Sequence, residues 1–263
     1  LGPIPAMSLK GAAIATTIGR GVAVTGQFMI LFFGWGRIKI GVRDFILNIA
    51  IMWNLIRVSL GGIGQFLIGT SSWVFLMRIM SEFGSDVLAG YTISIRVMMF
   101  TLMPAWGMSN AAATLVGQNL GAQKPDRAEI SVWKTGKYNA IFMGVISLFY
   151  LLFAPFIIGL FSDNEAVVTN GALSLQVIAA GYIFYAYGMV VTQSFNGAGD
   201  TKTPTIINFF CFWVFQLPFA YLAAITFDWG PMGVFIAITL AEVLIAVTSI
   251  VLFRKGKWKS VKV

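Results

Sequence analysis

Residues 138–161 read YNAIFMGVISLFYLLFAPFIIGLF, an apolar run without a charged side chain. A transmembrane α-helix needs roughly 20 mostly apolar residues to cross a hydrocarbon core about 30 Å thick. Further runs of that length lie at about 11–33, 58–80, 87–112, 171–195, 203–227 and 229–253. Lipid offers no hydrogen-bond partner to a backbone amide, and these runs are too long for barrel strands. The sequence therefore predicts an all-α membrane protein, a bundle of about seven transmembrane helices.

The composition agrees with a membrane protein and narrows its chemistry. Of the 263 residues, 58% are hydrophobic and 11% are charged, whereas about a quarter of a soluble domain is charged. The chain has no His and a single Cys211, so it cannot form an internal disulfide or a Cys/His metal cluster. Catalysis by a Ser/His pair or a bound metal would lack its base or its ligands. We expect no enzyme, no metal and no cofactor.

The charges of the connecting loops alternate and predict the orientation in the membrane. Basic residues gather on every second connection and on the C-terminal tail, which hold 14 of the 18 bases. These bases are Arg37, Lys39, Arg43, Arg57, Lys124, Arg127, Lys134, Lys137, Lys202, Arg254, Lys255, Lys257, Lys259 and Lys262. By the positive-inside rule, these connections and the C-terminus face the cytoplasm. The net charge of +8 is thus a topology signal, and we expect no nucleic-acid partner.

The segment between the first two runs differs from both. Residues 38–58 read IKIGVRDFILNIAIMWNLIRV, with apolar side chains at spacings of one, three and four, which predicts an amphipathic helix at the membrane interface. We therefore divide the chain into residues 1–37, residues 38–57 as this linker helix, and residues 58–263 as a six-helix lobe with a basic tail. The first and last runs also match weakly at an offset of 222 residues, which aligns Arg20 with Glu242. Repeats build the two halves of many transporters.

Two motifs connect the chain with a known family. AAATLVGQNLGAQKPDRAE (residues 111–129) and QSFNGAGDTKTPT (residues 193–205) resemble the C-terminal half of the multidrug and toxic compound extrusion (MATE) family. The resemblance implies one lobe of a two-lobed, twelve-helix antiporter in the cytoplasmic (inner) membrane. Such a transporter exports amphipathic, cationic compounds by alternating access driven by H⁺ or Na⁺. Residues 1–37 would then be the last helix of the N-terminal lobe. The chain begins with Leu1, and we expect it to be a piece of a longer protein.

The motif residues themselves allow two interpretations. They are Gly117, Gln118, Asn119 and Gly121 in the first motif, and Gly197, Gly199 and Asp200 in the second. Both motifs fall at cytoplasmic helix ends, where they either shape turns and helix packing or form part of a cytoplasmic gate. A Gly-x-x-x-Gly step at Gly117 and Gly121 allows close helix contact. Pro125 suits the first turn of the next helix, and Thr203 followed by Pro204 predicts an N-cap and first turn.

Charges within the spans are the first candidates for function, because each costs about 2.5–3.5 kcal/mol at the membrane centre. Glu242 would carry a proton or cation for coupling, or form a structural ion pair. Arg96 would line the transport cavity and set selectivity or pair with Glu242, or it would be fixed between helices. Arg20 is the corresponding charge of the first span. Arg78 lies near a helix end, from which its side chain can reach the interface.

Uncharged polar residues provide candidates for the substrate cavity: Gln65, Thr70, Tyr185 and Gln193. Tyr185 could hold a cationic drug through a cation–π contact, or simply fill the membrane core as other rings do. Some MATE members that couple to sodium carry carboxylates in the middle of the helices that correspond to the second and fifth runs. This chain has Gly69, Thr70 and Tyr185 there, which puts a sodium site in this lobe in doubt.

Two other functions fit parts of the sequence. A flippase for a lipid-linked sugar, from the same superfamily, would use Arg20 and Arg96 to meet a pyrophosphate. A seven-helix receptor would share the predicted topology, although neither a retinal lysine in the last span nor an outer cysteine pair is present. The two quoted motifs argue against a receptor. We expect the partners to be the bilayer, small amphipathic or cationic substrates and further N-terminal helices of the same protein.

Overall fold

The computed structural model describes residues 8–34, 39–41 and 47–260 and divides into two units, residues 1–54 and 55–263. The described part of the first unit consists mainly of α1 (Ser8–Phe33). Its stretch Ala13–Phe33 is long and apolar enough to cross a membrane, as the first run predicted. Arg20 lies on this helix with an exposed side chain.

The helix that follows, α2, extends over Ile49–Ser81. Asn48 caps its start, since its side-chain oxygen accepts hydrogen bonds from the amides of Ala50 (3.1 Å) and Ile51 (3.2 Å). This differs from the separate interfacial helix expected over residues 38–57. Residue 38 and residues 42–46 lie outside the described residues, residues 39–41 and 47–48 are not helical, and residues 49–57 form the first turns of α2. The cap starts the helix within the expected linker, and the apolar sequence that follows continues it into the span as one helix.

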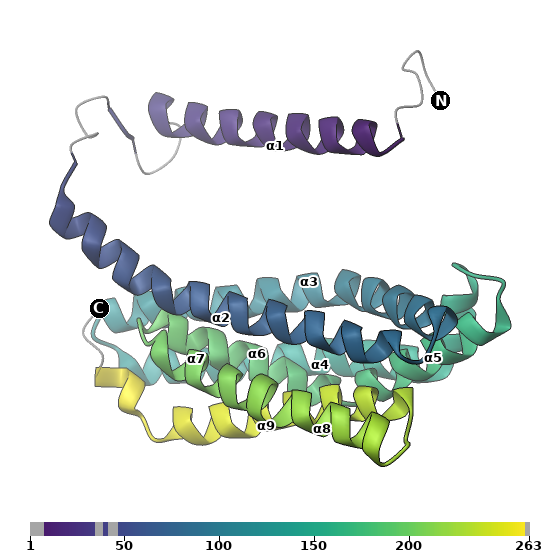
Figure 1. Cartoon of the computed structure of the whole chain (residues 1–263). Coiled ribbons are helices and arrows are strands. Elements are labelled where there is room, and N and C mark those ends of the chain that lie inside the picture. Colours follow the sequence, from purple (N-terminus) through teal and green to yellow (C-terminus); the bar gives the residue numbers. More distant parts are fainter. Residues whose placement is uncertain (1–7, 35–38, 42–46, 261–263) are drawn as a thin grey trace. The chain divides into compact units, whose positions relative to one another are not determined.

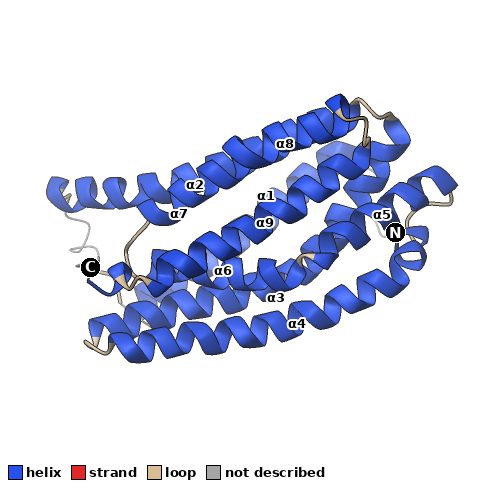
Figure 2. Cartoon of the chain, turned by 90° about the horizontal axis from the view of Figure 1, so that it is seen from below, coloured by secondary structure: helices blue, strands red, loops and turns tan. Residues whose placement is uncertain are grey.

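The second unit is built from long helices that run side by side (Figure 1). They are α3 (Ser85–Gly121), α4 (Pro125–Gly159), α5 (Glu165–Ala180), α6 (Tyr182–Gly197) and α9 (Pro231–Arg254). Between α6 and α9 lies a composite helix of α7 (Lys202–Asn208), η2 (Phe209–Gln216), α8 (Leu217–Tyr221) and η3 (Leu222–Thr226). The described residues contain helices and loops but no strand (Figure 2).

These helices confirm the predicted spans. In the described part of the chain, six helices are each long and apolar enough to cross a membrane. The pair α5 and α6, bent by 57° at its break, passes the same test together, as one broken span or a re-entrant loop. The bend falls at Gly181, where a Cβ would lie 2.8 Å from Thr239 on α9. Pro104 and Pro155, by contrast, lie inside the continuous helices α3 and α4.

Pro218 accompanies the irregular backbone of the composite helix. A proline inside a helix has no amide hydrogen and clashes with the carbonyl four residues earlier. Here the backbone before it is widened to a π-helix over Phe209–Gln216, and a second π segment follows at Leu222–Thr226. Wide turns of this kind inside helices frequently occur at functional sites.

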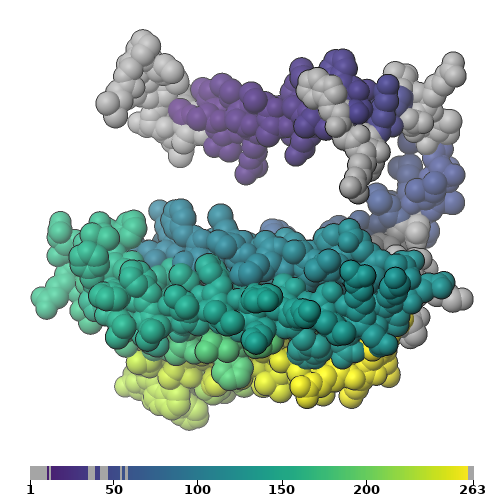
Figure 3. Space-filling model, turned by 180° about the vertical axis from the view of Figure 1, so that it is seen from behind, coloured from purple at the N-terminus to yellow at the C-terminus, as the bar shows by residue number. Residues whose placement is uncertain are grey.

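The core of this unit is apolar and tightly packed. Its largest buried side chains include Tyr91 on α3, Met143 on α4, Leu175 on α5 and Phe235 on α9. A Cβ at Gly90 would lie only 2.5 Å from the Val167 carbonyl oxygen, so small residues set the distance between α3 and α5. In the space-filling view, side chains of α3 and α4 form a broad surface with α9 along its lower border (Figure 3).

The C-terminal tail folds back onto the bundle. At Gly256 (φ 72°) the chain turns and enters a short 3-10 helix, η4 (Lys257–Ser260). Trp258 is buried and stacks on Phe253 with ring centroids 4.5 Å apart. The Trp258 indole N–H donates to the Phe253 carbonyl at 2.9 Å. The first residues of the basic tail are therefore part of the fold.

Candidate functional site

Glu242 lies midway along α9 with a half-buried side chain. Its carboxyl is close enough to the Tyr185 hydroxyl on α6 and the Cys211 thiol on η2 to interact electrostatically with both. Among the residues that the structure describes, no basic side chain pairs with it. A carboxylate within a bilayer is costly unless it binds a proton, a cation or a counter-charge. The carboxyl group thus acts electrostatically on groups of two other helical segments and has no basic partner among the described residues.

The intramembrane arginines do not supply that counter-charge within the second unit. Arg96 is exposed on α3, about three turns from the start of the helix, and lines a groove of about 410 Å³. Across the described ranges, no ion pair or hydrogen bond of its guanidinium is found. Arg20 belongs to the other unit of the structure. That it is the counterpart of Glu242 in a sequence repeat stays a prediction. Arg78 pairs with Glu82 at 3.0 Å near the end of α2.

A chain of amide side chains links three helices near the end of α6. Gln65 of α2 exchanges hydrogen bonds with Asn196 of α6, at 3.1 and 3.2 Å, and donates to the Thr201 carbonyl at 3.2 Å. Asn196 donates to Gln193 at 2.6 Å, and Gln193 donates to Asn110 of α3 at 3.1 Å. The structure thus brings two of the predicted cavity residues, Gln65 and Gln193, into one hydrogen-bonded row.

The other predicted cavity residues lie elsewhere. Thr70 is exposed on α2, and its hydroxyl forms no hydrogen bond with the described residues. Tyr185 belongs to the surroundings of Glu242, and its ring centroid lies 6.3 Å from that of Tyr182. The four predicted cavity residues therefore do not form one site: Gln65 and Gln193 lie in the amide row, Tyr185 lies near Glu242, and Thr70 lies on an exposed helix face.

The two glycine-containing motifs meet in space. Gly117 of α3 faces Gly197 of α6, since a Cβ at Gly117 would lie 3.1 Å from the Gly197 carbonyl oxygen. A Cβ at Gly197 would overlap the backbone of Ala113. At Gly121 a Cβ would meet nothing within 4 Å, so only the first glycine of the expected Gly-x-x-x-Gly step is a contact point.

The remaining motif residues shape turns. The Asn119 side chain donates to the Leu115 carbonyl at 2.7 Å, while the carbonyls of Gln118 and Asn119 accept from residues beyond the helix end. Gly199 has a φ of 82°, which favours glycine. Asp200 accepts from the Thr203 amide at 3.1 Å and from its hydroxyl at 2.6 Å.

One local expectation in this motif was wrong. Thr203 does not cap the next helix, because α7 begins at Lys202. Instead, the Asp200 carboxylate accepts a hydrogen bond from the Thr203 amide. A carboxylate accepts such a hydrogen bond as readily as a hydroxyl, and it lies earlier in the turn. Pro125, in contrast, begins α4 as expected.

Sequence reasoning missed the contacts of the tail. Lys259 donates to Glu129 at 2.6 Å and to Asp126 at 3.2 Å, both on the first turns of α4 outside the apolar run 138–161. The hydrogen bond from Lys259 lowers the pKa of Glu129, and the same bond raises the pKa of Lys259. Arg254 lies 5.6 Å from the centre of the Trp133 ring. The aromatic and basic residues in FRKGKWKS were the only sequence signal of this contact.

The apolar spans define a polytopic helical membrane protein, and among the described residues of its spans Glu242 is a carboxyl group without a basic partner. The family model described as MatE matches residues 63–222, more than half of the chain. The chain belongs to this family.

Similar proteins support the assignment. The chain is 25% identical over 260 residues to the probable multidrug resistance protein NorM of Thermotoga maritima, with 97% of the chain and 55% of that protein covered. The NorM protein of Mannheimia succiniciproducens is 27% identical over 262 residues, with 93% and 54% covered. The chain thus spans about half the length of the curated relatives it matches. The family consists of transporters rather than enzymes.

A solved structure shows the same fold. A multidrug resistance MATE family transporter of the MOP superfamily in an outward-facing conformation superposes with a TM-score of 0.83 at 23% identity, with 95% of this chain and 56% of that chain covered. The chain is a multi-pass membrane protein whose fold corresponds to part of such a transporter.

Proposed function

We propose that this chain forms the C-terminal lobe and the preceding helix of a secondary antiporter that exports amphipathic, cationic compounds. The family match and the names of the relatives support export of drugs, and the loop charges support a cytoplasmic C-terminus. The remaining N-terminal helices would complete the cavity between the two lobes. Transport then proceeds by alternating access, with H⁺ or Na⁺ flowing inward.

The single observation that carries the coupling is the position of Glu242. In its midway position on α9 it has no basic partner in the described part of the chain, and it interacts with Tyr185 and Cys211 from two other spans. A carboxyl group in such a place can exchange a proton or a cation against a cationic substrate. Tyr185, which interacts electrostatically with that carboxyl, offers a ring face to a cationic substrate.

The test uses the chain expressed together with the coding sequence upstream of Leu1, in cells that lack their own efflux pumps. Glu242→Gln should reduce efflux of a cationic dye to the level of cells without the transporter, whereas Glu242→Asp should retain part of it. Glu165→Gln is the matched control, because it makes the same change at an exposed helix start. Wild-type efflux in the Glu242→Gln variant would exclude Glu242 from coupling.

Applied gradients identify the ion. A proton gradient without sodium should drive dye export if Glu242 exchanges protons, and a sodium gradient at equal pH on both sides should drive it if Glu242 binds Na⁺. Both responses should disappear in Glu242→Gln. Export that requires ATP and neither gradient would contradict a secondary antiporter.

The alternative is a flippase for a lipid-linked sugar. The exposed Arg96 beside a groove of about 410 Å³ favours this second function, because an unpaired guanidinium suits a phosphate group. If this alternative holds, Arg96→Gln should abolish translocation of a pyrophosphate-linked lipid in proteoliposomes. Neither the wild type nor any variant should then export the dye. Dye export that survives in Arg96→Gln supports the antiporter.

A further inference from the structure

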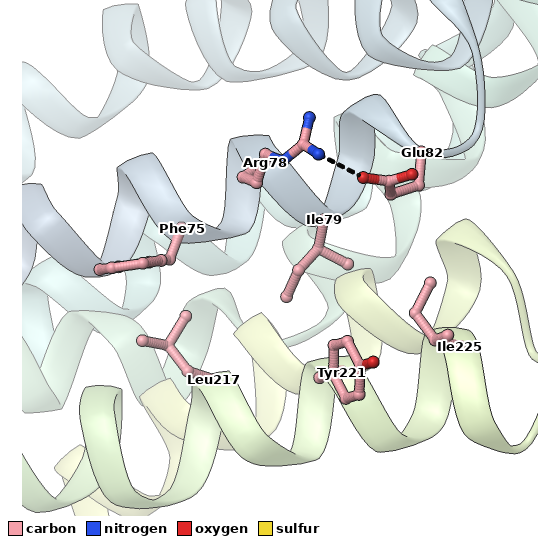
Figure 4. A pocket seen from close by; sticks show the side chains of 7 residues that line it. All are labelled: Phe75, Arg78, Ile79, Glu82, Leu217, Tyr221 and Ile225. Carbon is pink, nitrogen blue, oxygen red and sulfur yellow. Dashed lines mark ion pairs between the residues drawn. The ribbon is translucent and has the colours of Figure 1, made fainter.

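A cavity of about 520 Å³ lies between the second half of α2 and the α8–η3 segment, away from Glu242 and from the amide row. Figure 4 shows its lining, and Ile79 points from α2 toward Tyr221. The lining residues are Phe75, Arg78, Ile79, Glu82, Leu217, Tyr221 and Ile225. The cavity volume falls within the roughly 300–1,000 Å³ range of small-molecule sites.

The protein's own contacts leave this space open. Along α2, the last hydrogen bond to the composite helix joins Ser72 to Gln216 at 3.1 Å. Beyond it, no hydrogen bond within the described residues connects α2 to α8 or η3. Phe75 and Tyr221 remain about half exposed, at 49% and 54%. An apolar ligand lying there would cover rings that the chain leaves uncovered.

The rim of the cavity carries both signs of charge. Arg78 and Glu82 form an ion pair at 3.0 Å one helical turn apart, and their side chains are 76% and 53% exposed. Figure 4 shows this pair on the α2 side of the apolar lining. Each group can bind a further partner, since a guanidinium has five donors and a carboxylate about four acceptor sites. A ligand with a single charge would be attracted by one group and repelled by the other.

We propose that this cavity binds a phospholipid with a phosphoethanolamine headgroup. The phosphate contacts Arg78, the primary ammonium donates to Glu82, and an acyl chain lies against Phe75, Ile79 and Leu217. The headgroup carries one positive and one negative charge, which complement Glu82 and Arg78. An anionic lipid or a cationic drug could complement only one of the two. The lipid would link α2 and α8 where no hydrogen bond between described residues does. The orientation predicted from the loop charges would put the site in the outer leaflet, but binding does not depend on that orientation.

The headgroup is tested by native mass spectrometry of the purified chain. Phosphatidylethanolamine, phosphatidylcholine and phosphatidylglycerol with identical acyl chains are added separately, and the fraction of chain carrying one lipid is measured. Phosphatidylcholine keeps the phosphate but has no N–H to donate to Glu82. We expect phosphatidylethanolamine to bind about tenfold more tightly than either of the other lipids, the difference that a charge-assisted hydrogen bond provides. Equal binding of the three lipids overturns the proposal.

Variants locate the bound lipid. Glu82→Gln should remove the preference for phosphatidylethanolamine over phosphatidylcholine, and Arg78→Gln should weaken binding of both. Ile79→Trp should block binding by filling the cavity. Asp163→Asn, an exposed carboxylate in the α4–α5 loop, is the control and should bind as the wild type does. A preference that persists in Glu82→Gln overturns the assignment of the ammonium to that residue.

A photoreactive lipid tests the occupant in membranes. Phosphatidylethanolamine with a diazirine in its acyl chain should label residues 75–82 and 217–225 when the chain is expressed with its upstream coding sequence. This experiment reports on binding and not on transport, so its failure is distinct from a failure of the antiporter proposal. Labelling of the isolated chain but not of the longer protein would mean that upstream helices fill the cavity, which overturns the proposal.

Discussion

The bundle around α3, α4, α6 and α9 and residues 55–81 of α2 belong to the same unit but are held in different ways. The bundle is joined by buried apolar side chains and by glycines that bring backbones into contact. In residues 59–81 of α2, only Ser72, Leu76 and Met80 are buried. Near its end, α2 joins the apolar core through Leu76 and Met80. Before them it is attached by hydrogen bonds, from Gln65 to Asn196, from Trp213 to the Ile68 carbonyl and from Ser72 to Gln216.

The difference indicates which part can move. Interdigitated apolar side chains cannot shift without opening cavities, so the bundle behaves as one body. Amides and hydroxyls can exchange one partner for another or for water at little net cost, and interhelical hydrogen bonds in membranes are worth only about 0.6 kcal/mol on average, with measured values up to about 1.7 kcal/mol. We infer that the part of α2 attached by these hydrogen bonds, residues 65–72, can change its position more easily than the bundle helices can.

The largest effect is expected from a substitution in the bundle. Gly197→Val would place its side chain on the backbone of Ala113 and separate α6 from α3. Overpacking against rigid backbone costs typically 1–3 kcal/mol and occasionally more, and we expect the upper end, about 3 kcal/mol. Thermal unfolding in detergent, followed by circular dichroism, measures the loss.

The first motif contains a matched control for this substitution. Gly121→Val adds the same side chain where no atom lies within 4 Å, so its melting temperature should stay close to the wild-type value. If the two variants melt alike, the close contact between the motifs does not set the helix distance. Gly197 would then be free to serve a gate instead.

A smaller effect is expected at the amide row. Gln65→Met keeps the length of the side chain but removes its bonds to Asn196 and Thr201, which should destabilise the attachment of α2 by about 1–2 kcal/mol. Hydrogen exchange of the amides of residues 59–72 should increase, while exchange in α3 and α4 stays unchanged. Thr70→Val is the control on the same helix, because the Thr70 hydroxyl has no partner in the described part of the chain. Exchange rates that are equal in the two variants would show that the amide row does not hold α2.

The spans and the contacts between them differ in how well the sequence predicts them. The spans could be predicted because a membrane requires about 20 apolar residues whatever the tertiary structure is. The place of Glu242 inside a span followed from the same count. The helix expected over residues 38–57 did not follow, because an amphipathic pattern does not say whether a helix ends before the span or continues into it. The cap at Asn48 sets where the helix begins, and the helix then continues without a break to Ser81.

The partners of each residue could not be predicted. Gln65 and Asn196 are 131 residues apart in sequence, and Glu242 interacts electrostatically with Tyr185 and Cys211 on two other helical segments. Helix periodicity identifies faces only when one face is polar, and the spans are apolar all around. A lone amide in a span therefore indicates a polar contact without naming its partner. Asn196 lay inside a quoted motif, yet only the packing reveals that it joins α2 to α6.

The smallest effect is expected at the tail, where exposed charges fasten a buried ring. The pKa of Glu129 is lowered by its hydrogen bond from Lys259, so this contact stabilises the docked tail above the ordinary carboxyl pKa of about 4.3 and is lost as the pH falls through the lowered value. The pKa of Lys259 is raised, so the contact is also lost when the pH rises through that value. Between these limits the attachment should not change with pH.

A nitroxide at Ser260→Cys, with Cys211 replaced by Ala, can follow the attachment by its mobility. Mobility should be constant near neutral pH and increase on acidification. Glu129→Gln should show the increased mobility at every pH, and Asp126→Asn much less of it, because Lys259 lies 2.6 Å from Glu129 and 3.2 Å from Asp126. Partly exposed ion pairs contribute only about 0–1 kcal/mol, and Trp258 stays stacked on Phe253, so the tail should loosen without detaching. If Glu129→Gln leaves the mobility unchanged, the aromatic stack alone holds the tail, and apolar packing rather than charge fixes this end of the bundle as it fixes the core.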